Sequence, residues 1–472
     1  MFRNKIIVLL ILLIILVITF TLITKIKGRV NQEKSIKALC PNCNVIVVTL
    51  DTLGADHMGL YGYKIPTTPF LDSFGLDRSI VFDQAIAQGS WTPLSHTSIL
   101  TGRYPEEYGI YGSGDKLPPG TQTLAVALKD RGYTTHAVSA AILIQPKWGW
   151  GQGFDSFDQR WYLGSVKTND AKDTFTHAVA WIKINKKQPF FLFINSNHLH
   201  SPHTPETTNV LEELGYQPPF NINDERDVVG PDVNKGIATK QDLTLLKTNY
   251  DGLVREVDDQ VKYFINELDK MGLTKNTIII FEGDHSQQFG EHNILGWYGV
   301  YNTQIHVPFI LYVPGQKPQR ISSVVELRSI PSTVLDLIGA KPDPSFHGPS
   351  LLPLLLGKAE NIIALTMNAQ TVQGNLGMLQ SLFAKSPSVW DSMKNSPDPT
   401  VRNVKDIPQL VWHSARSNDW QLIKNGDGSL ELYNLKIDPK ENINLISDWG
   451  NLSSSDKNAA LKLFKALNLK SL

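Results

Sequence analysis

Two recurring patterns of apolar and polar positions divide the chain. Nearly continuous apolar, β-branched runs are typical of strands buried on both faces of a parallel sheet. Strand-like runs occur at Asn44–Leu50, Tyr133–Ser139, Phe190–Asn195 and Thr277–Phe281, and helical spacing occurs at Leu124–Arg131 and Leu243–Met271. Strands that alternate with helices in this way predict an α/β fold with a doubly wound, mostly parallel sheet flanked by helices.

The pattern changes near the C-terminus, where two short alternating runs appear. Trp420–Ile423 and Leu430–Tyr433 lie on either side of Asn425-Gly-Asp-Gly428, a turn sequence typical of a β-hairpin. We therefore expect a small C-terminal antiparallel α+β subdomain. The predicted division is an N-terminal segment (1–28), a linker (29–43), a large α/β domain (44–360) and the C-terminal subdomain (361–472).

The N-terminal segment contains a long apolar run, Ile6–Thr24, without a charged residue. A helix needs roughly 20 such residues to span a bilayer. The run is longer than the core of a typical signal peptide, and no small-residue cleavage site follows it. It predicts an uncleaved transmembrane helix and a single-pass membrane protein. Basic residues flank the run on both sides, so they do not decide its orientation.

Composition and charge exclude one class of partner. The 472 residues are 42% hydrophobic and 19% charged, which is enough for one or two large cores. Lys and Arg together number 45, as do Asp and Glu, so the formal net charge is 0. A nucleic-acid-binding protein normally shows an excess of basic residues, so we expect no nucleic-acid partner.

The only two cysteines form the motif Cys40-Pro-Asn-Cys43. One Cys-x-x-Cys pair is half of a four-ligand zinc site, and the sequence contains no second half. A local disulfide is the favoured interpretation if this segment is exported.

The stretch Gln88–Arg103 has the composition of a turn that leads into a short helix. Thr92 has the residue type of a helix N-cap, Pro93 fits the first helical position, and Gly102 is a typical stop. A hydroxyl at this place lies near backbone N–H groups at the positive end of the helix, which favours a bound oxyanion. Taken alone, the pattern also fits a threonine that only caps a structural helix.

Acidic and histidine residues follow three of the predicted strands. They are Asp51 after the first strand, His198, His200 and His203 after the third, and Asp284 and His285 after the fourth. The carboxyl ends of parallel strands meet at one edge of the sheet, where ligands bind. Each group alone also fits a helix cap or a polar surface loop. Together they predict a divalent cation site, in which an imidazole shifts the preference from Ca²⁺ towards Mn²⁺ or Zn²⁺.

The Thr92 stretch resembles the signature of the sulfatase family, in the alkaline phosphatase superfamily. That signature is Cys/Ser-x-Pro-Ser/Ala-Arg followed by a run ending in Thr-Gly-Arg. Alignment on Thr101-Gly102-Arg103 places Thr92 at the nucleophile, Ser95 at the signature Ser and His96 at its Arg. The family nucleophile is oxidised to formylglycine, and threonine cannot give that aldehyde. Thr92 is instead similar to the unmodified threonine of the related nucleotide pyrophosphatase/phosphodiesterases and phosphoethanolamine transferases.

The resemblance extends from Asn44 almost to the end of the chain, through Asn44–Tyr63, Tyr250–Asp259 and the C-terminal hairpin. It implies metal ligands, catalytic residues and substrate-binding residues. The implied metal ligands are Asp51, Thr92, Asp284 and His285, the catalytic residues are Thr92 and His203, and the substrate-binding residues are His96, Arg103 and His200. The implied cofactor is a divalent metal ion, Ca²⁺, Mn²⁺ or Zn²⁺.

The chain departs from the family at several of these places. Thr52 and Ser201 stand where aspartates of the family or its relatives are expected, and the basic residue expected near Gly296-Trp297 is absent. His96 replaces the signature arginine. The metal site therefore has fewer carboxylates than a sulfatase site, and the sulfate-binding residues are fewer.

Two hypotheses on function follow. The first is a membrane-anchored, metal-dependent hydrolase (or transferase) of phosphate or sulfate esters, with Thr92 as metal-activated nucleophile and its catalytic domain outside the cytoplasm. Its substrate would be a small-molecule, lipid or glycan ester. The alternative, motivated by the missing acidic and basic residues, is a catalytically inactive sulfatase-like binding or scaffold protein at the cell surface.

Overall fold

The computed structural model of the chain describes residues 38–112, 115–160, 171–187, 189–200, 205, 208–217, 239–297, 299–358, 362–370 and 410–469. The run Ile6–Thr24 lies outside these residues. No helix in the described ranges is long and apolar enough to cross a membrane. The longest of them, α9 (Lys240–Lys270), has 31 residues, but charged side chains recur along its whole length. The prediction of a single-pass membrane location is therefore corrected, because no helix in the described part of the chain could span a membrane.

A nine-stranded sheet forms the centre of the molecule, in the order β11-β2-β10-β6-β1-β5-β3-β4, with β9 paired to β2. The strands are β1 (Asn44–Leu50), β2 (Ile80–Ile86), β3 (Thr134–Ser139), β4 (Ser156–Gln159), β5 (Phe190–Ser196), β6 (Thr277–Glu282), β9 (His306–Val307), β10 (Phe309–Tyr312) and β11 (Gln319–Glu326). All neighbours pair in parallel except β10 and β9, which run antiparallel to the strands beside them. The predicted mostly parallel α/β sheet is confirmed.

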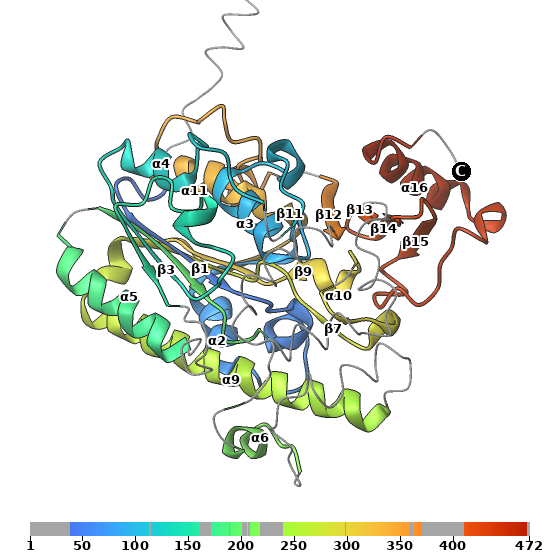
Figure 1. Ribbon diagram of the computed structural model, residues 1–472, viewed down its shortest axis with the longest axis horizontal. Helices are drawn as coiled ribbons and strands as arrows, with labels where there is room; N and C mark the ends of the chain where they lie inside the picture. Colours follow the sequence, from blue (N-terminus) through green and yellow to red (C-terminus); the bar gives the residue numbers. More distant parts are fainter. Residues whose placement is uncertain are drawn as a thin grey trace, which may run out of the picture.

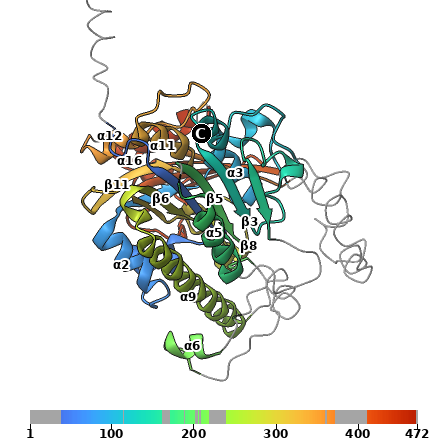
Figure 2. The same ribbon diagram turned by 90° about the vertical axis from the view of Figure 1, so that its left-hand side faces the viewer.

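Helices cover both faces of this sheet (Figures 1 and 2). One face carries α2 (Pro69–Arg78), α5 (Ala171–Asn185) and α9, and the other carries α3 (Thr92–Thr101), α4 (Leu124–Lys129) and α11 (Ile330–Ile338). Alternate residues of β1 explain why the strand is apolar throughout. Val45 and Val47 pack in the cluster with α3 and α11, whereas Ile46 and Val48 pack in the cluster with α5 and α9.

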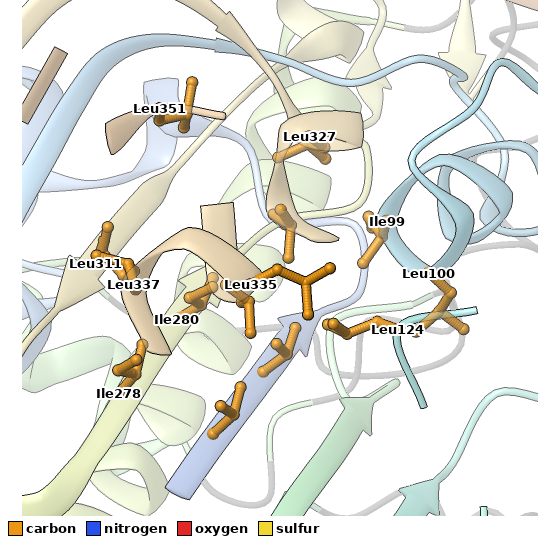
Figure 3. Close-up of a cluster of buried hydrophobic side chains, with 14 of the residues drawn as sticks. Ile99, Leu100, Leu124, Ile278, Ile280, Leu311, Leu327, Leu335, Leu337 and Leu351 are labelled. Carbon is orange, nitrogen blue, oxygen red and sulfur yellow. The ribbon is translucent and has the colours of Figure 1, made fainter. Parts of the chain in front are cut away.

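The apolar side of α3 is fixed by a buried cluster, drawn in Figure 3. Ile99 and Leu100 of α3 lie in the same cluster as Leu335 of α11 and Ile278 and Ile280 of β6. All five side chains are at most 1% exposed. This packing holds the start of α3, with Thr92, at a constant place relative to the end of β6.

A second, four-stranded antiparallel sheet lies toward the C-terminus and confirms the predicted hairpin. Its strands are β12 (Ala364–Gln370), β13 (Leu410–Arg416), β14 (Trp420–Lys424) and β15 (Leu430–Asn434). Helix α16 (Ser454–Ala466) packs on it through Leu463 and Phe464. The division at residue 360 remains a prediction. A smaller two-stranded ribbon, β7 (Gln288–Phe289) and β8 (Leu295–Gly296), follows the end of β6.

Before β1, Cys40 and Cys43 form a disulfide. Both cysteines are buried, and the backbone N–H of Cys40 donates to the carbonyl of Leu337 at the end of α11. The local disulfide interpretation is therefore confirmed, and the zinc half-site is excluded.

Candidate active site

Three side chains from two adjacent strand ends meet at one point. Asp51 follows β1, and Asp284 and His285 follow β6. One ligand atom of each residue lies within 4.8 Å of the others, and all three side chains are at most 1% exposed. The sequence places these residues 233 positions apart, and the parallel pairing of β1 with β6 brings them together.

The backbone segments that follow β1 and β6 pass very close to each other at this cluster. Thr52 has φ of 66°, which is uncommon for a β-branched residue, and its N–H donates to Asp284 Oδ1 at 3.1 Å. At Gly283, an added Cβ would lie 2.2 Å from the carbonyl oxygen of Leu53. Only glycine allows the end of β6 to pass so near the loop after β1.

The carboxylates of this site leave acceptor atoms without donors. Both oxygens of Asp51 and Oδ2 of Asp284 are buried and have no donor at normal hydrogen-bond geometry among the described residues, although the side chains of Asn195 and Thr92 lie near Asp51 and oppose the rise in its pKa. Burial and the charge of Asp284 raise the pKa of Asp51 well above its usual value, and burial raises the pKa of Asp284 to about 7. Buried oxygens of this kind are suited to a hard cation, which would lower both pKa values.

The third group, His285, directs a nitrogen lone pair into the same space. Its Nδ1 lies 3.0 Å from the carbonyl of Ser286, which can only accept, so Nδ1 carries the proton and donates. Its Nε2 then faces Asp284 Oδ2 at 3.5 Å and Asp51 Oδ1 at 4.0 Å. Burial lowers the pKa of His285, so its imidazole is neutral. The cluster offers two carboxylates and one imidazole lone pair, a donor set that fits a divalent cation.

Thr92 reaches this cluster from the start of α3. Its Oγ1 lies 3.3 Å from His285 Nε2. Thr92 is the first residue of α3 rather than its cap, which is Trp91, and Gly102 ends the helix in a left-handed conformation as expected. The N–H groups of Leu94 and Ser95 already donate to the carbonyl of Trp91. Because Pro93 has no N–H, the helix start offers an oxyanion fewer donors than the sequence suggested.

Ser95, the other hydroxyl of the signature, is turned away from the cluster. It is fully buried, and its Oγ donates to the carbonyl of Gly89 at 2.7 Å. Of the two candidate hydroxyls, only that of Thr92 lies beside His285.

His96 is buried beside Asp284 of the cluster and is not exposed to solvent. Its Nδ1 is 2.9 Å from the carbonyl of Thr92 and 3.5 Å from Asp284 Oδ2, and its Nε2 is 3.0 Å from Asn195 Nδ2. Burial lowers its pKa to about 3. His96 is therefore a neutral, fully buried side chain, and unlike the arginine of the signature it adds no positive charge.

Asn195 was not among the residues singled out from the sequence. It is a fully buried polar residue near the end of the apolar strand β5, where it contacts His96. A polar residue near the carboxyl end of a buried parallel strand is the signal that could have identified it.

The other site residues predicted from the sequence are Arg103, His200 and His203, and the structure does not bring all of them to the Asp51–Asp284–His285 cluster. Arg103 lies beyond the far end of α3, where its guanidinium donates to the carbonyl of Ser345 at 2.7 Å and contacts Glu107 at 3.2 Å. His200 lies in a half-buried turn after β5, with its ring 4.4 Å from that of Trp297. His203 lies outside the described residues.

Comparison with known proteins agrees with this architecture. Residues 43–340, more than half of the chain, match the model of the sulfatase family. An arylsulfatase of Clostridium perfringens is 25% identical over 380 residues, which cover 66% of this chain and 78% of that protein. A protein solved in complex with its substrate D-glucosamine-2-N,6-O-disulfate has a TM-score of 0.68 at 17% identity, covering 90% of this chain and 97% of its own. The phosphonate monoester hydrolase of Agrobacterium radiobacter has a TM-score of 0.66 at 18% identity, with 90% and 96% covered.

Proposed function

The chain belongs to the sulfatase family of ester hydrolases, and we propose that it is a metal-dependent hydrolase of sulfate or phosphate esters with Thr92 as nucleophile. The observation that carries this proposal is the position of the Thr92 hydroxyl, 3.3 Å from His285 Nε2 in the Asp51–Asp284–His285 cluster. A nucleophile needs an activating group within reach, and this cluster is the group that Thr92 contacts.

The cation would be held by Asp51, Asp284 and His285, with the Thr92 hydroxyl as a further ligand. When bound, a divalent cation lowers the pKa of a coordinated hydroxyl and stabilises negative charge on the ester oxygens. Ca²⁺, Mn²⁺ and Zn²⁺ all accept this combination of carboxylate, hydroxyl and imidazole, so the donor set does not select one of them.

The protein's own residues orient the reaction. The packing of α3 aims the Thr92 hydroxyl at the cluster, and the Nδ1–H donation of His96 to the Thr92 carbonyl fixes the first turn of the helix. His285 is held with Nε2 toward Thr92 by the hydrogen bond from its Nδ1 to Ser286. Thr92 Oγ, after losing its proton to solvent, would form the new bond to sulfur or phosphorus while the bond to the leaving oxygen breaks, and the leaving oxygen would take a proton from water. A second water would then attack the sulfur or phosphorus, releasing the acid and restoring the Thr92 hydroxyl.

The proposal also concerns which ester is the substrate, that of sulfuric acid or that of a phosphorus acid. His96 is neutral and buried where the signature has an arginine, so the site has one fixed positive charge fewer to bind a sulfate oxygen. A phosphate or phosphonate ester therefore fits the site as well as a sulfate ester, and both classes belong in the test.

The test is turnover of sulfate, phosphate and phosphonate esters with Ca²⁺, Mn²⁺ or Zn²⁺. We expect Thr92→Ala to reduce kcat at least about a thousandfold, the range seen when a nucleophile is removed. Thr92→Ser keeps the hydroxyl and should retain most of the activity. Ser95→Ala is the matched control, because Ser95 faces Gly89. Activity that survives Thr92→Ala would refute the nucleophile. Absence of turnover with every metal and ester would favour the inactive binding protein.

A further inference from the structure

Four polar side chains lie in one row across the central sheet, on the face that α3 covers. The register pairs Glu282 of β6 with Thr49 of β1, Thr49 with Asn195 of β5, and Asn195 with Ser139 of β3. Alternate residues of a strand face the same side, and the residues two positions before these four all pack in the cluster with α3. All four side chains are at most 1% exposed. We call them the polar row.

Packing does not explain why these positions are polar. Burying a polar side chain in an apolar layer costs free energy unless the side chain is hydrogen-bonded. Glu282 Oε2, Asn195 Oδ1 and Ser139 Oγ nevertheless have no hydrogen-bond partner among the described residues. The apolar residues two positions earlier in the same strands show that hydrophobic side chains fit this layer. A polar side chain is therefore expected here for a role other than packing.

Asn195 is the member of the polar row that contacts the helix of the proposed nucleophile. Its Nδ2 lies 3.0 Å from His96 Nε2. The adjacent hydroxyl of the row, that of Thr49, donates to Glu282 and so does not orient the Asn195 amide. The hydrogen bond to His96 therefore sets the orientation of this amide.

The contacts of His96 determine which of its ring nitrogens carries the proton. Nδ1 lies 2.9 Å from the carbonyl of Thr92, which can only accept, so Nδ1 carries the proton and donates. Nε2 then has a lone pair, to which Asn195 Nδ2 donates. The imidazole is thus held between β5, through Asn195, and the first turn of α3, through Thr92. Without the Asn195 amide, the ring could turn or take its other tautomer, and the bond to the Thr92 carbonyl would be lost.

The Asn195 amide also lies beside the other half of the site. It is near the carboxylate of Asp51, and the backbone N–H of Asp51 donates to the carbonyl of Ser196 at 3.0 Å. The end of β5 therefore contacts a proposed metal ligand and, through His96, the helix start. A displaced amide at this point would change the position of Thr92 relative to Asp51.

We propose that Asn195 is a positioning residue that holds His96 in its Nδ1–H tautomer and thereby aligns Thr92 with the Asp51–Asp284–His285 cluster. The effect on catalysis rests on the proposed function, whereas the tautomer of His96 does not. Asn195 acts through His96 and not on the ester itself. Such a role matters because a misplacement of about 1 Å at a reacting group can reduce the rate about a hundredfold.

The first measurement is heteronuclear NMR of the full-length protein, labelled at its histidine nitrogens and loaded with diamagnetic Ca²⁺ or Zn²⁺. The chemical shifts of the ring nitrogens report which one carries the proton, and the signal lost in His96→Gln assigns His96 among the 12 histidines. We expect Nδ1–H in the wild type and a changed or mixed tautomer in Asn195→Leu. Asn195→Asp should draw the proton to Nε2, because a carboxylate only accepts. A wild-type protein with its proton on Nε2 would overturn the proposal even if neither variant folds.

The second measurement is kcat and KM on the ester that the wild type hydrolyses. We expect Asn195→Leu to reduce kcat about ten- to a hundredfold and to change KM less than about twofold. Ser139→Ala is the matched control, because Ser139 is equally buried, is paired in register with Asn195 and has an Oγ without a partner among the described residues. It should change neither kcat nor the tautomer of His96. A changed tautomer with wild-type kcat in Asn195→Leu would overturn the positioning role.

The two measurements separate Asn195 from the proposed chemistry. If the wild type hydrolyses no ester but the Nδ1–H tautomer is lost in Asn195→Leu, the hydrolase is refuted and the hold of Asn195 on His96 is supported. An unchanged tautomer in Asn195→Leu overturns the proposal whether or not the protein is active.

Discussion

The hydroxyl of Tyr250 donates a 2.7 Å hydrogen bond to the carbonyl of Thr52, 198 residues away in the sequence. This bond holds the residue after Asp51 in its left-handed conformation, from which the Thr52 N–H donates to Asp284. Helix α9 thus supports the loop after β1 that carries Asp51 and Thr52. The neighbouring Asp251 contributes to the same support, since it contacts His57 at 2.7 Å and Tyr63 at 2.6 Å in the same loop.

Tyr250→Phe should therefore weaken the candidate metal site without touching its ligands. The Thr52 carbonyl would lose its donor, and we expect a loss of about 1–2 kcal/mol in unfolding free energy. Metal affinity should fall about tenfold, as for other residues that orient ligands. Calorimetric metal titration and chemical denaturation measure the two effects. Tyr312→Phe is the control, because its hydroxyl donates to Thr274 at the other end of β6. Unchanged metal affinity would contradict this role.

Metal addition should stabilise the folded protein. A cation at 100 times its Kd adds about 2.7 kcal/mol if it binds only the native state. We expect Tm to rise with Ca²⁺, Mn²⁺ or Zn²⁺ and to fall again with a chelator.

Asp284→Asn should change that response in two ways. Without metal, the variant should be at least as stable as the wild type, since one of two mutually repelling buried carboxylates is removed. When metal is added, the Tm of the variant should rise much less than that of the wild type. A wild-type Tm that none of the three ions changes would argue against the site.

His96→Ala should destabilise the fold more than an exposed histidine substitution. The variant leaves a cavity and removes the partner of buried Asn195, so we expect a loss of about 2–4 kcal/mol. His177→Ala, in a half-exposed ion pair with Asp158, should cost less than about 1 kcal/mol. Equal losses in denaturant titrations would show that His96 is not the buried support described here.

Asp258 should make stability depend on pH. It accepts the N–H groups of Phe70 and Leu71 at the start of α2, each at 2.8 Å, and burial raises its pKa from the usual 3.8 to about 7. Between these values the folded state keeps the proton and the unfolded state loses it. The contribution of Asp258 to the unfolding free energy should therefore fall as pH rises from about 4 to 7, by at most about 1.4 kcal/mol per pH unit. Asp258→Asn should make the pH dependence shallower by this amount, and parallel pH curves for the two proteins would contradict the assignment.

Much of the fold was predictable because hydrophobic pattern is a local property. The run Asn44–Leu50 places apolar residues on both faces of its strand, interrupted only by Asn44 and Thr49, and β1 has those bounds. The direction of β10 was not predictable in this way. Phe309–Tyr312 is apolar like its neighbours, and its antiparallel pairing with β6 depends on the route of the chain between them.

The sequence by itself determined the strand ends at which Asp51, Asp284 and His285 stand, and the helix start that carries Thr92, because residue type and spacing define both. Only the tertiary structure decided that His96 is buried and neutral, that Arg103 lies at the far end of its helix, and that Asn195 contacts His96. These outcomes depend on which distant side chains share one space. Which distant side chains contact one another depends on how the strands and helices pack. The periodicity of apolar residues along the chain does not specify that packing.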